Sequence, residues 1–127
     1  MVYKVMVGLV LMLDILCIDA HASIEGQQML VCKNALQQVR EGALLLDVRT
    51  GWEYAFGALP RAVHMPYDEI SYRVNELPAD KNRTLVVYCR SGRRSAIARA
   101  ALLKLGYLHV LDAGGYSDLK KCWDTRR

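Results

Sequence analysis

Short hydrophobic stretches alternate with segments of helical spacing along most of this chain. Residues 43–48 form an apolar run that a charge closes, and residues 84–88 are apolar and β-branched. Runs of this kind are typical of strands that are buried on both faces of a parallel sheet. Shorter strands are predicted at residues 62–65 and 108–111. The hydrophobic pattern therefore predicts four strands.

Helices are predicted between these strands. Apolar residues recur on one face of residues 34–40 and 94–105, and a glycine follows each segment. Thr50 and Glu53 form a capping-box pattern at the start of a short helix through Tyr54. Further predictions are helices at residues 68–76 and 116–123, a loose arm at 23–29 and a turn at 114–115. Because strands alternate with helices, an α/β fold with a mainly parallel sheet is predicted.

The N-terminal segment has the pattern of a secretory signal peptide. Lys4 precedes an apolar run, and an A-x-A cleavage pattern ends at Ala22. The chain is therefore interpreted as a signal peptide at residues 1–22 and one domain at residues 23–127. The alternative is a buried first helix or strand. Because the apolar run is short and Asp14 interrupts it, no stable membrane insertion is expected.

Composition and charge limit the classes of partner. The chain has 127 residues, 53% of them hydrophobic and 24% charged, which suits one globular domain with a single core. Its formal net charge is +4, and the basic residues concentrate in residues 90–99 and in the C-terminal tail. A nucleic-acid-binding surface needs a basic stripe with aromatic or helical patterning, which this sequence lacks. No nucleic-acid partner is expected.

Removal of the signal peptide would leave three cysteines, which are Cys32, Cys89 and Cys122. Cys32 and Cys122 could form a disulfide while Cys89 stays reduced, or both could be buried free thiols, and the sequence leaves these alternatives open. The cysteines and histidines do not have the spacing of a zinc site. Neither a metal nor another cofactor is therefore expected.

Cys89 stands at the carboxyl end of the most strand-like segment, before a glycine-containing loop and a helix. Open α/β sheets bind ligands at this position. Loop N–H groups and the positive end of the helix dipole are predicted to lower the pKa of Cys89. Arg90, Arg93 and Arg94 are predicted to attract an oxyanion such as thiosulfate or sulfite. Ser95 is predicted to cap the helix or to donate to the site. The alternative is an inert buried cysteine.

A series of motifs extends over most of residues 29–123. They are Asp47-Val48-Arg49-Thr50, Glu53-Tyr54, Gly57, Pro60, Ala62, residues 87–96 and Gly114-Gly115-Tyr116. In this order they resemble the rhodanese family. With its secretory start, the chain is most similar to the small single-domain rhodaneses of the bacterial periplasm. A periplasmic location is expected, or a cytoplasmic one if the N-terminal segment is not a signal.

The resemblance implies a fold, an activity and a set of site residues. The fold would be a mainly parallel five-stranded sheet with helices on both faces, and the activity would be that of a thiosulfate sulfurtransferase with a catalytic Cys89. Asp47 and Arg49 would support the site. The residues implied to bind substrate are Arg90, Ser91, Gly92, Arg93, Arg94 and Ser95. The family usually has a histidine and a glycine where this chain has Ala58 and Arg61, which puts contacts around that turn in doubt.

The expected reaction passes a sulfur atom from a small donor to a thiophilic acceptor through a Cys89 persulfide. Thiosulfate is the expected donor, and cyanide or a thiol the acceptor. The competing classes are a rhodanese-fold cysteine phosphatase or arsenate reductase and a non-catalytic sulfur-binding or regulatory module. Phosphatases that resemble rhodaneses have a Cys-x5-Arg loop, but here Arg94 stands at the fifth position after the cysteine and Ser95 at the sixth. This smaller loop favours sulfur over phosphate.

Overall fold

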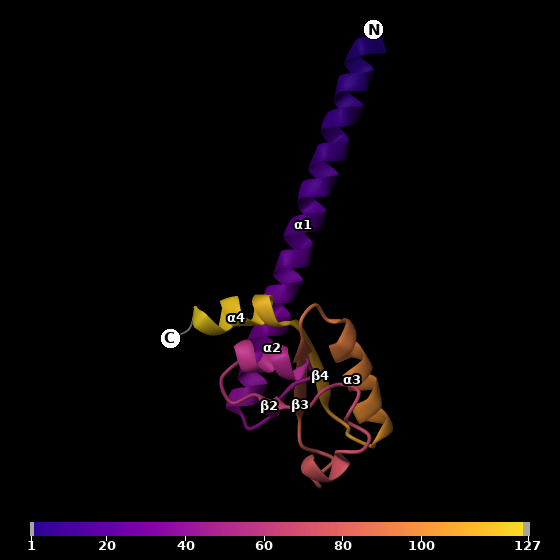
Figure 1. The fold of residues 1–127 in the computed structure, drawn as a ribbon. Coiled ribbons are helices and arrows are strands. Elements are labelled where there is room, and N and C mark those ends of the chain that lie inside the picture. Colours follow the sequence, from indigo (N-terminus) through magenta and orange to yellow (C-terminus); the bar gives the residue numbers. More distant parts are fainter. Residues whose placement is uncertain (1, 126–127) are drawn as a thin grey trace. The chain divides into compact units, whose positions relative to one another are not determined.

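The computed structural model describes the backbone of residues 2–125 and the side chains of residues 20–125. Residues 1–30 and residues 31–127 are two compact units, which are described separately. Helix α1 (Val2–Arg40) contributes to both (Figure 1). The second unit continues with β1 (Leu44–Asp47), α2 (Gly51–Phe56), β2 (Val63–His64), the 3₁₀ helix η1 (Val74–Glu76), β3 (Leu85–Cys89), α3 (Arg93–Lys104), β4 (Val110–Gly115) and α4 (Tyr116–Asp124).

Residues 23–29 are helical, so the predicted loose arm is wrong. The segment contains glutamate and glutamine, which are good helix formers, and no proline interrupts it. The predicted signal peptide falls mostly on residues 1–19, whose side chains lie outside the described residues, and its cleavage stays a prediction. Among the described residues, no helix is long and apolar enough to cross a membrane.

The strands form one parallel sheet in the order β2-β1-β3-β4. These four strands are the ones that the hydrophobic pattern predicts. The fifth strand, which came from the family resemblance, is absent from the described residues. The segment before the first strand is helical, and the connections between the strands contain only helices, turns and loops.

Two local predictions are wrong. Residues 68–76 form turns that end in η1 instead of a regular helix. Only Ile70 is buried in this segment, so no apolar stripe holds a helix against the core. Residues 114–115 belong to the end of β4 and form no separate turn, because Cys89 pairs with Gly115 across the sheet.

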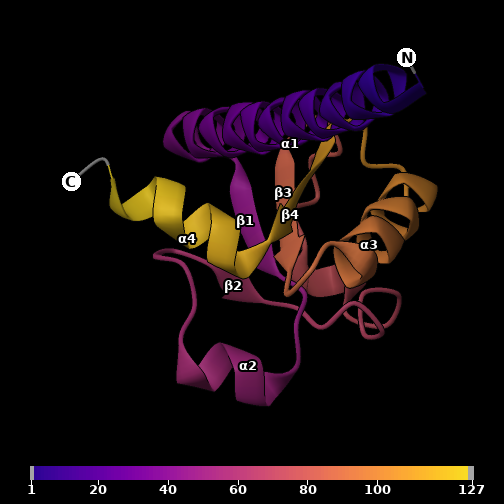
Figure 2. The same cartoon turned by 90° about the horizontal axis from the view of Figure 1, so that it is seen from above.

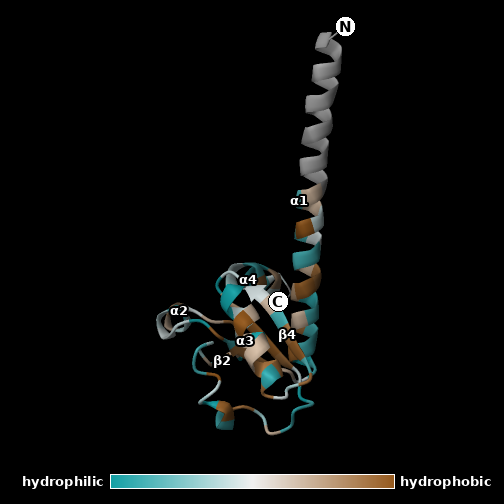
Figure 3. Ribbon diagram, turned by 90° about the vertical axis from the view of Figure 1, so that its right-hand side faces the viewer, coloured by the Kyte–Doolittle hydropathy of each residue, from teal (hydrophilic) through white to brown (hydrophobic). Residues whose placement is uncertain are grey.

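The core consists of one hydrophobic layer on each face of the sheet. Along β3, Leu85, Val87 and Cys89 pack in the layer that contains the inner face of α3, whereas Val86 and Tyr88 pack in the layer of α4 and the end of α1. Figure 2 shows the strands between α3 and α4. Figure 3 shows hydrophobic residues in the sheet and both hydrophobic and hydrophilic residues on α3. The prediction of helices on both faces is confirmed.

Cys32 and Cys122 form a disulfide between α1 and α4, within the second unit. Their Cα atoms are 6.3 Å apart, a normal separation for a disulfide. Among the described residues, Cys89 is the free cysteine, and it is buried. Of the two alternatives that the sequence left open, the structure therefore contains the disulfide.

Candidate active site

Cys89 is the last residue of β3, and its thiol lies in a loop that closes against the start of α3. Gly92 has a φ of 101°, a left-handed conformation that suits glycine, and precedes the first residue of the helix. This conformation allows the Gly92 N–H to donate to Cys89 Sγ over 2.9 Å. Ser95, in the first turn of α3, has its Oγ 3.4 Å from the same sulfur. The local sequence thus builds a cradle of donors around one sulfur atom.

The cradle favours the thiolate form of Cys89. Burial raises the pKa of the thiol, but hydrogen bonds from Ser95, Gly92 and Ser91 oppose this effect and leave the pKa below its ordinary value. The Ser95 hydroxyl also lies 3.0 Å from the Gly92 carbonyl oxygen, to which it donates when the sulfur carries its own proton. When Cys89 is ionised, the sulfur can only accept hydrogen bonds. The Gly92 N–H and the Ser95 hydroxyl then both stabilise its negative charge.

The loop arginines have different environments. Arg94 forms two parallel hydrogen bonds with Glu53 of α2, from Nη1 to Oε1 over 2.7 Å and from Nη2 to Oε2 over 2.9 Å. This pair lowers the pKa of Glu53 to about 2. Arg90 and Arg93 are exposed and form no ion pair with any residue that the structure describes. The free positive charge at the loop therefore comes from Arg90 and Arg93, whereas Arg94 fastens the loop to α2.

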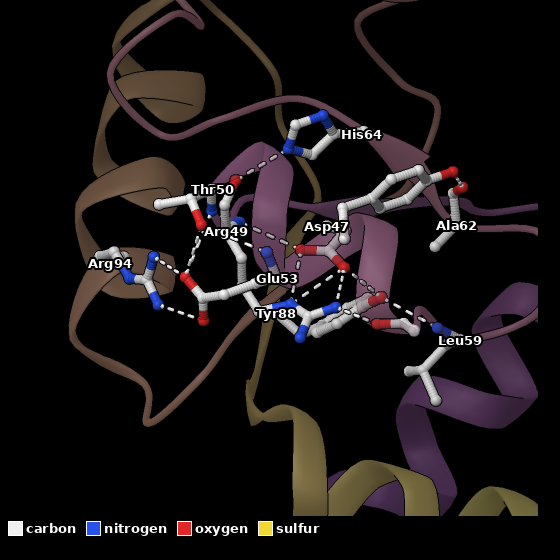
Figure 4. A network of polar contacts seen from close by, with 11 residues as sticks. Asp47, Arg49, Thr50, Glu53, Leu59, Ala62, His64, Tyr88 and Arg94 are labelled. Atoms are coloured by element: carbon white, nitrogen blue, oxygen red, sulfur yellow. Dashed lines mark hydrogen bonds and ion pairs between the residues drawn. The ribbon is translucent and has the colours of Figure 1, made fainter.

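Asp47 and Arg49 form a buried ion pair, with 2.6 Å between Oδ2 and Nη2 (Figure 4). The same Nη2 donates to the Gly57 carbonyl over 2.7 Å. Tyr88 donates its hydroxyl to Asp47 Oδ2 over 2.7 Å and accepts the N–H of Leu59 over 3.1 Å. Burial raises the pKa of Tyr88, so this hydroxyl stays protonated. The network ties β1 and β3 to the loop that follows α2, and neither charged group contacts Cys89 Sγ.

Sequence reasoning missed the roles of Glu53, Tyr88 and Tyr116 around the site. Glu53 accepts the Thr50 N–H and forms the predicted capping box, and this local pattern concealed its ion pair with Arg94. Tyr88 belongs to a predicted strand and to the motif of residues 87–96, but its hydrogen bond to Asp47 was not predicted. Tyr116 places its ring 4.2 Å from the Arg49 guanidinium carbon, a contact between residues far apart in the chain. None of the three contacts has a sequence signal of its own.

The turn with the unusual residues Ala58 and Arg61 is formed without the family's glycine. Arg61 has a φ of 69°, and among the described residues it is the one non-glycine residue with a positive φ. A glycine adopts this conformation without steric cost, which explains a glycine at this position in other members. His64 donates its Nε2–H to the Arg49 carbonyl oxygen over 2.9 Å, and its ring stacks on Tyr54, which is a structural role.

A cleft of about 370 Å³ opens beside the cysteine loop. It is lined by Arg49, Trp52, Glu53, Phe56, Gly57, Arg90, Tyr116 and Ser117. The end of β4 lies close to the cysteine loop, because a Cβ on Gly115 would lie 2.8 Å from the Arg90 carbonyl oxygen. Among the described residues, no group of three or more histidine, cysteine or acidic side chains could hold a metal ion.

The fold and the site define a class of protein: a parallel α/β domain with a buried free cysteine between a strand end and a helix N-terminus. The rhodanese-like domain model matches residues 31–122, so the chain belongs to the rhodanese-like family. It is 45% identical over 75 residues to a sulfurtransferase of Allochromatium vinosum, which covers 59% of this chain and 68% of that protein. It is also 38% identical over 74 residues to thiosulfate sulfurtransferase PspE of Escherichia coli, which covers 58% of this chain and 71% of that protein.

A solved structure of a rhodanese with anions from E. coli has the same fold. Its TM-score to this chain is 0.58 at 36% identity, and the match covers 61% of this chain and 91% of the other. The α/β fold class and the family resemblance are thus confirmed. The relatives support sulfur transfer as the general activity of this chain.

Proposed function

We propose that the protein transfers sulfane sulfur from thiosulfate to a thiol or to cyanide through a persulfide on Cys89. The observation that carries this proposal is the cradle, in which Gly92 N–H and Ser95 Oγ surround Cys89 Sγ at 2.9 Å and 3.4 Å. A thiolate is the nucleophilic form of cysteine, and this environment lowers the pKa of the thiol. Catalysis requires no metal or cofactor.

In the first step, the Cys89 thiolate attacks the outer sulfur of thiosulfate. A bond forms between Sγ and that sulfur, the sulfur–sulfur bond of thiosulfate breaks, and sulfite leaves with the electron pair. Arg90 and Arg93 attract the dianionic donor to the loop, since no acidic side chain in the described part of the chain pairs with them. The loop N–H groups then hold the terminal sulfur, which carries the negative charge of the persulfide.

In the second step, the acceptor attacks the terminal sulfur and takes it away, and the electron pair of the broken bond returns to Cys89. The first step needs no general base when Cys89 attacks as a thiolate, the form that the cradle favours. In the second step the acceptor attacks as cyanide ion or as a thiolate that has already lost its proton. The two half-reactions share one covalent intermediate, so ping-pong kinetics are expected.

The main rival is a cysteine phosphatase or an arsenate reductase on the same fold. The phosphatases that resemble rhodaneses have their arginine at the sixth position after the cysteine, where this chain has Ser95, and Arg94 at the fifth position is paired with Glu53. This pairing favours sulfur chemistry. A non-catalytic module is disfavoured because the cysteine and its donors are all present.

We also propose that residues 1–22 direct export and that the mature protein begins at Ser23 and acts in the periplasm. The Cys32–Cys122 disulfide supports this setting, because disulfides persist in oxidising compartments. We propose small-molecule partners, with neither nucleic acid nor stable membrane insertion involved. Intact mass of the protein purified from cells tests the proposal directly, since cleavage removes the first 22 residues.

Intact mass spectrometry after thiosulfate treatment tests the reaction. Wild type is expected to gain one sulfur, about 32 Da, and to lose it on addition of cyanide. Cys89→Ser is expected to gain nothing, and Tyr72→Ala, which changes an exposed aromatic side chain outside the site, should behave as wild type. Turnover of an aryl phosphate that disappears in Cys89→Ser, without sulfur uptake by wild type, would establish the rival instead.

A further inference from the structure

The cleft beside the cysteine loop contains features that sulfur uptake from thiosulfate does not use. Trp52 and Phe56, one turn apart on α2, are 77% and 86% exposed, and their rings stack with centroids 6.1 Å apart. Both line the cleft, as does Tyr116 from the opposite element, α4. Exposed aromatic residues gathered in one concavity are typical of a site for an organic ligand with apolar surface.

The uncompensated charge in this cleft is positive. The Glu53 carboxylate is bound by Arg94, and Arg49 is paired with Asp47, so these charges are compensated. Arg90 is the remaining charged residue of the lining, and it has no ion pair among the described residues. A ligand with a negative group is therefore favoured.

The size of the cleft and its position beside Cys89 restrict the class of ligand further. A volume of about 370 Å³ is at the lower end of the range for small-molecule sites. Arg90 directly follows Cys89, so the cysteine loop forms one wall of the cleft. Thiosulfate has no apolar surface to place on Trp52 and Phe56, but an acceptor with a carbon chain does.

We propose that this cleft binds the sulfur acceptor, and that the acceptor is a small organic thiol with an apolar chain and a carboxylate. This inference rests on the proposed sulfur transfer. Trp52 and Phe56 cover the chain of the acceptor, and Arg90 attracts its carboxylate. The acceptor thiolate forms a bond to the terminal sulfur of the persulfide, the bond from that sulfur to Cys89 Sγ breaks, and its electron pair remains on Cys89. The products are an organic persulfide and the free Cys89 thiolate, without a change in total charge.

The first experiment compares acceptors that differ in one group. Mercaptohexanoate and mercaptohexanol, each with its thiol at the far end of the chain, share the apolar segment and differ in the carboxylate. Wild type is expected to prefer the carboxylate about threefold in kcat/KM at low salt, and the preference should shrink as salt is added, because an exposed ion pair is weak and screened. Arg90→Gln should remove the preference. Equal kcat/KM values for the two thiols in wild type would overturn the assigned carboxylate.

The second experiment tests the aromatic wall. Trp52→Ala and Phe56→Ala each remove apolar contact with the carbon chain of the bound acceptor. Each variant is therefore expected to lower, by about tenfold, the ratio of kcat/KM for mercaptohexanoate to kcat/KM for cyanide. Tyr72→Ala is the matched control, since Tyr72 is 74% exposed and does not line the cleft. A ratio that stays at the wild-type value in both cleft variants would overturn the inference while sulfur transfer to cyanide remains intact.

A binding measurement separates the two proposals. Methylthiohexanoate is a thioether that cannot accept sulfur, and it is expected to change the fluorescence of Trp52. The chain has two tryptophans, so Trp52→Phe should lose the response and Trp123→Phe should keep it. If wild type binds the thioether but takes up no sulfur from thiosulfate, the proposed function fails and the assignment of an acceptor fails with it, whereas the cleft still binds a carboxylate with an apolar chain. Absence of saturable binding to wild type overturns the cleft assignment.

Discussion

At the scale of single residues, the site depends on which group supplies a proton to which atom. Ser95 is fully buried, and its hydroxyl has two acceptors within reach, Cys89 Sγ at 3.4 Å and the Gly92 carbonyl at 3.0 Å. Only the ionised sulfur competes strongly for this proton. Ser95 thus links the charge of the nucleophile to the first turn of α3.

Ser95→Ala is expected to raise the pKa of Cys89, because the variant loses a donor that stabilises the thiolate. The pH dependence of alkylation by iodoacetamide should move to higher pH, and the rate at pH 7 should fall about tenfold. Ser91→Ala is the control, since Ser91 is exposed and the variant keeps its backbone N–H. An unchanged pH profile in Ser95→Ala would mean that the hydroxyl bonds only to the Gly92 carbonyl.

Glu53→Gln separates two roles of one side chain. Glutamine can still complete the capping box with Thr50, but it cannot form the ion pair with Arg94. The pair lowers the pKa of Glu53 from 4.5 to about 2, so its stabilisation is complete above pH 4.5 and is lost as the pH falls through 2. Urea unfolding should show a loss of about 1–2 kcal/mol in the variant at pH 7.

The difference between Glu53→Gln and wild type should shrink as the pH is lowered toward 2. Glu41→Gln serves as the control, because Glu41 is exposed and accepts a hydrogen bond from the neutral side chain of Gln37. A difference that stays constant from pH 7 to pH 2 would assign the effect to packing instead of charge.

At the scale of secondary-structure elements, the cysteine loop is shaped by the end of β4. Gly115 has a φ of −93°, which any residue adopts, so backbone freedom does not explain this glycine. The reason is the space around it, because a Cβ would lie 2.8 Å from the Arg90 carbonyl oxygen and 3.6 Å from Ser91 Cα. Both are backbone atoms of the loop that holds the sulfur.

Gly115→Ala is expected to displace the loop and to destabilise the fold by roughly 1–3 kcal/mol, because a methyl group enters a closely packed contact. The rate of sulfur uptake from thiosulfate, measured by rapid mixing and intact mass spectrometry, should fall about tenfold or more because the donors around Cys89 move. Gly51→Ala is the control, since its Cβ would meet only His64 Cε1 at 3.9 Å. Wild-type uptake and stability in Gly115→Ala would show that the loop accommodates the methyl group.

Elements with a strong local signal could be predicted from the sequence, and so could the position of Cys89 between a strand end and a helix. β3 is buried along its whole length and α3 has a regular apolar face, so hydrophobicity alone defined both. Residues 68–76 and 23–29 lack such a face. The first segment was predicted as a helix and forms turns, and the second was predicted as a loose arm and is helical. The pairing of Arg94 with Glu53 joins residues 41 positions apart, and no local pattern specifies such a contact.

At the scale of the whole domain, the disulfide joins α1 to α4, on the face of the sheet opposite the layer that contains Cys89. Cys32 and Cys122 are both buried in the hydrophobic layer on that face, and they are 90 positions apart in the chain. Cys89 packs in the layer on the other face of the sheet. The domain therefore has an oxidised pair on one face and a free thiol on the other, and the sheet separates them.

Reduction of the disulfide is expected to lower the free energy of unfolding by about 2–4 kcal/mol, because the cross-link restricts a long segment of the unfolded chain. Urea unfolding of wild type should show this loss when reductant is added. The double variant Cys32→Ala, Cys122→Ala should have the stability of reduced wild type, apart from small cavity effects, and should not respond to reductant. Cys89 should still take up sulfur in the double variant, since neither cysteine contacts its loop. If reductant lowers the stability of wild type and of the double variant equally, then the disulfide is not the source of the effect.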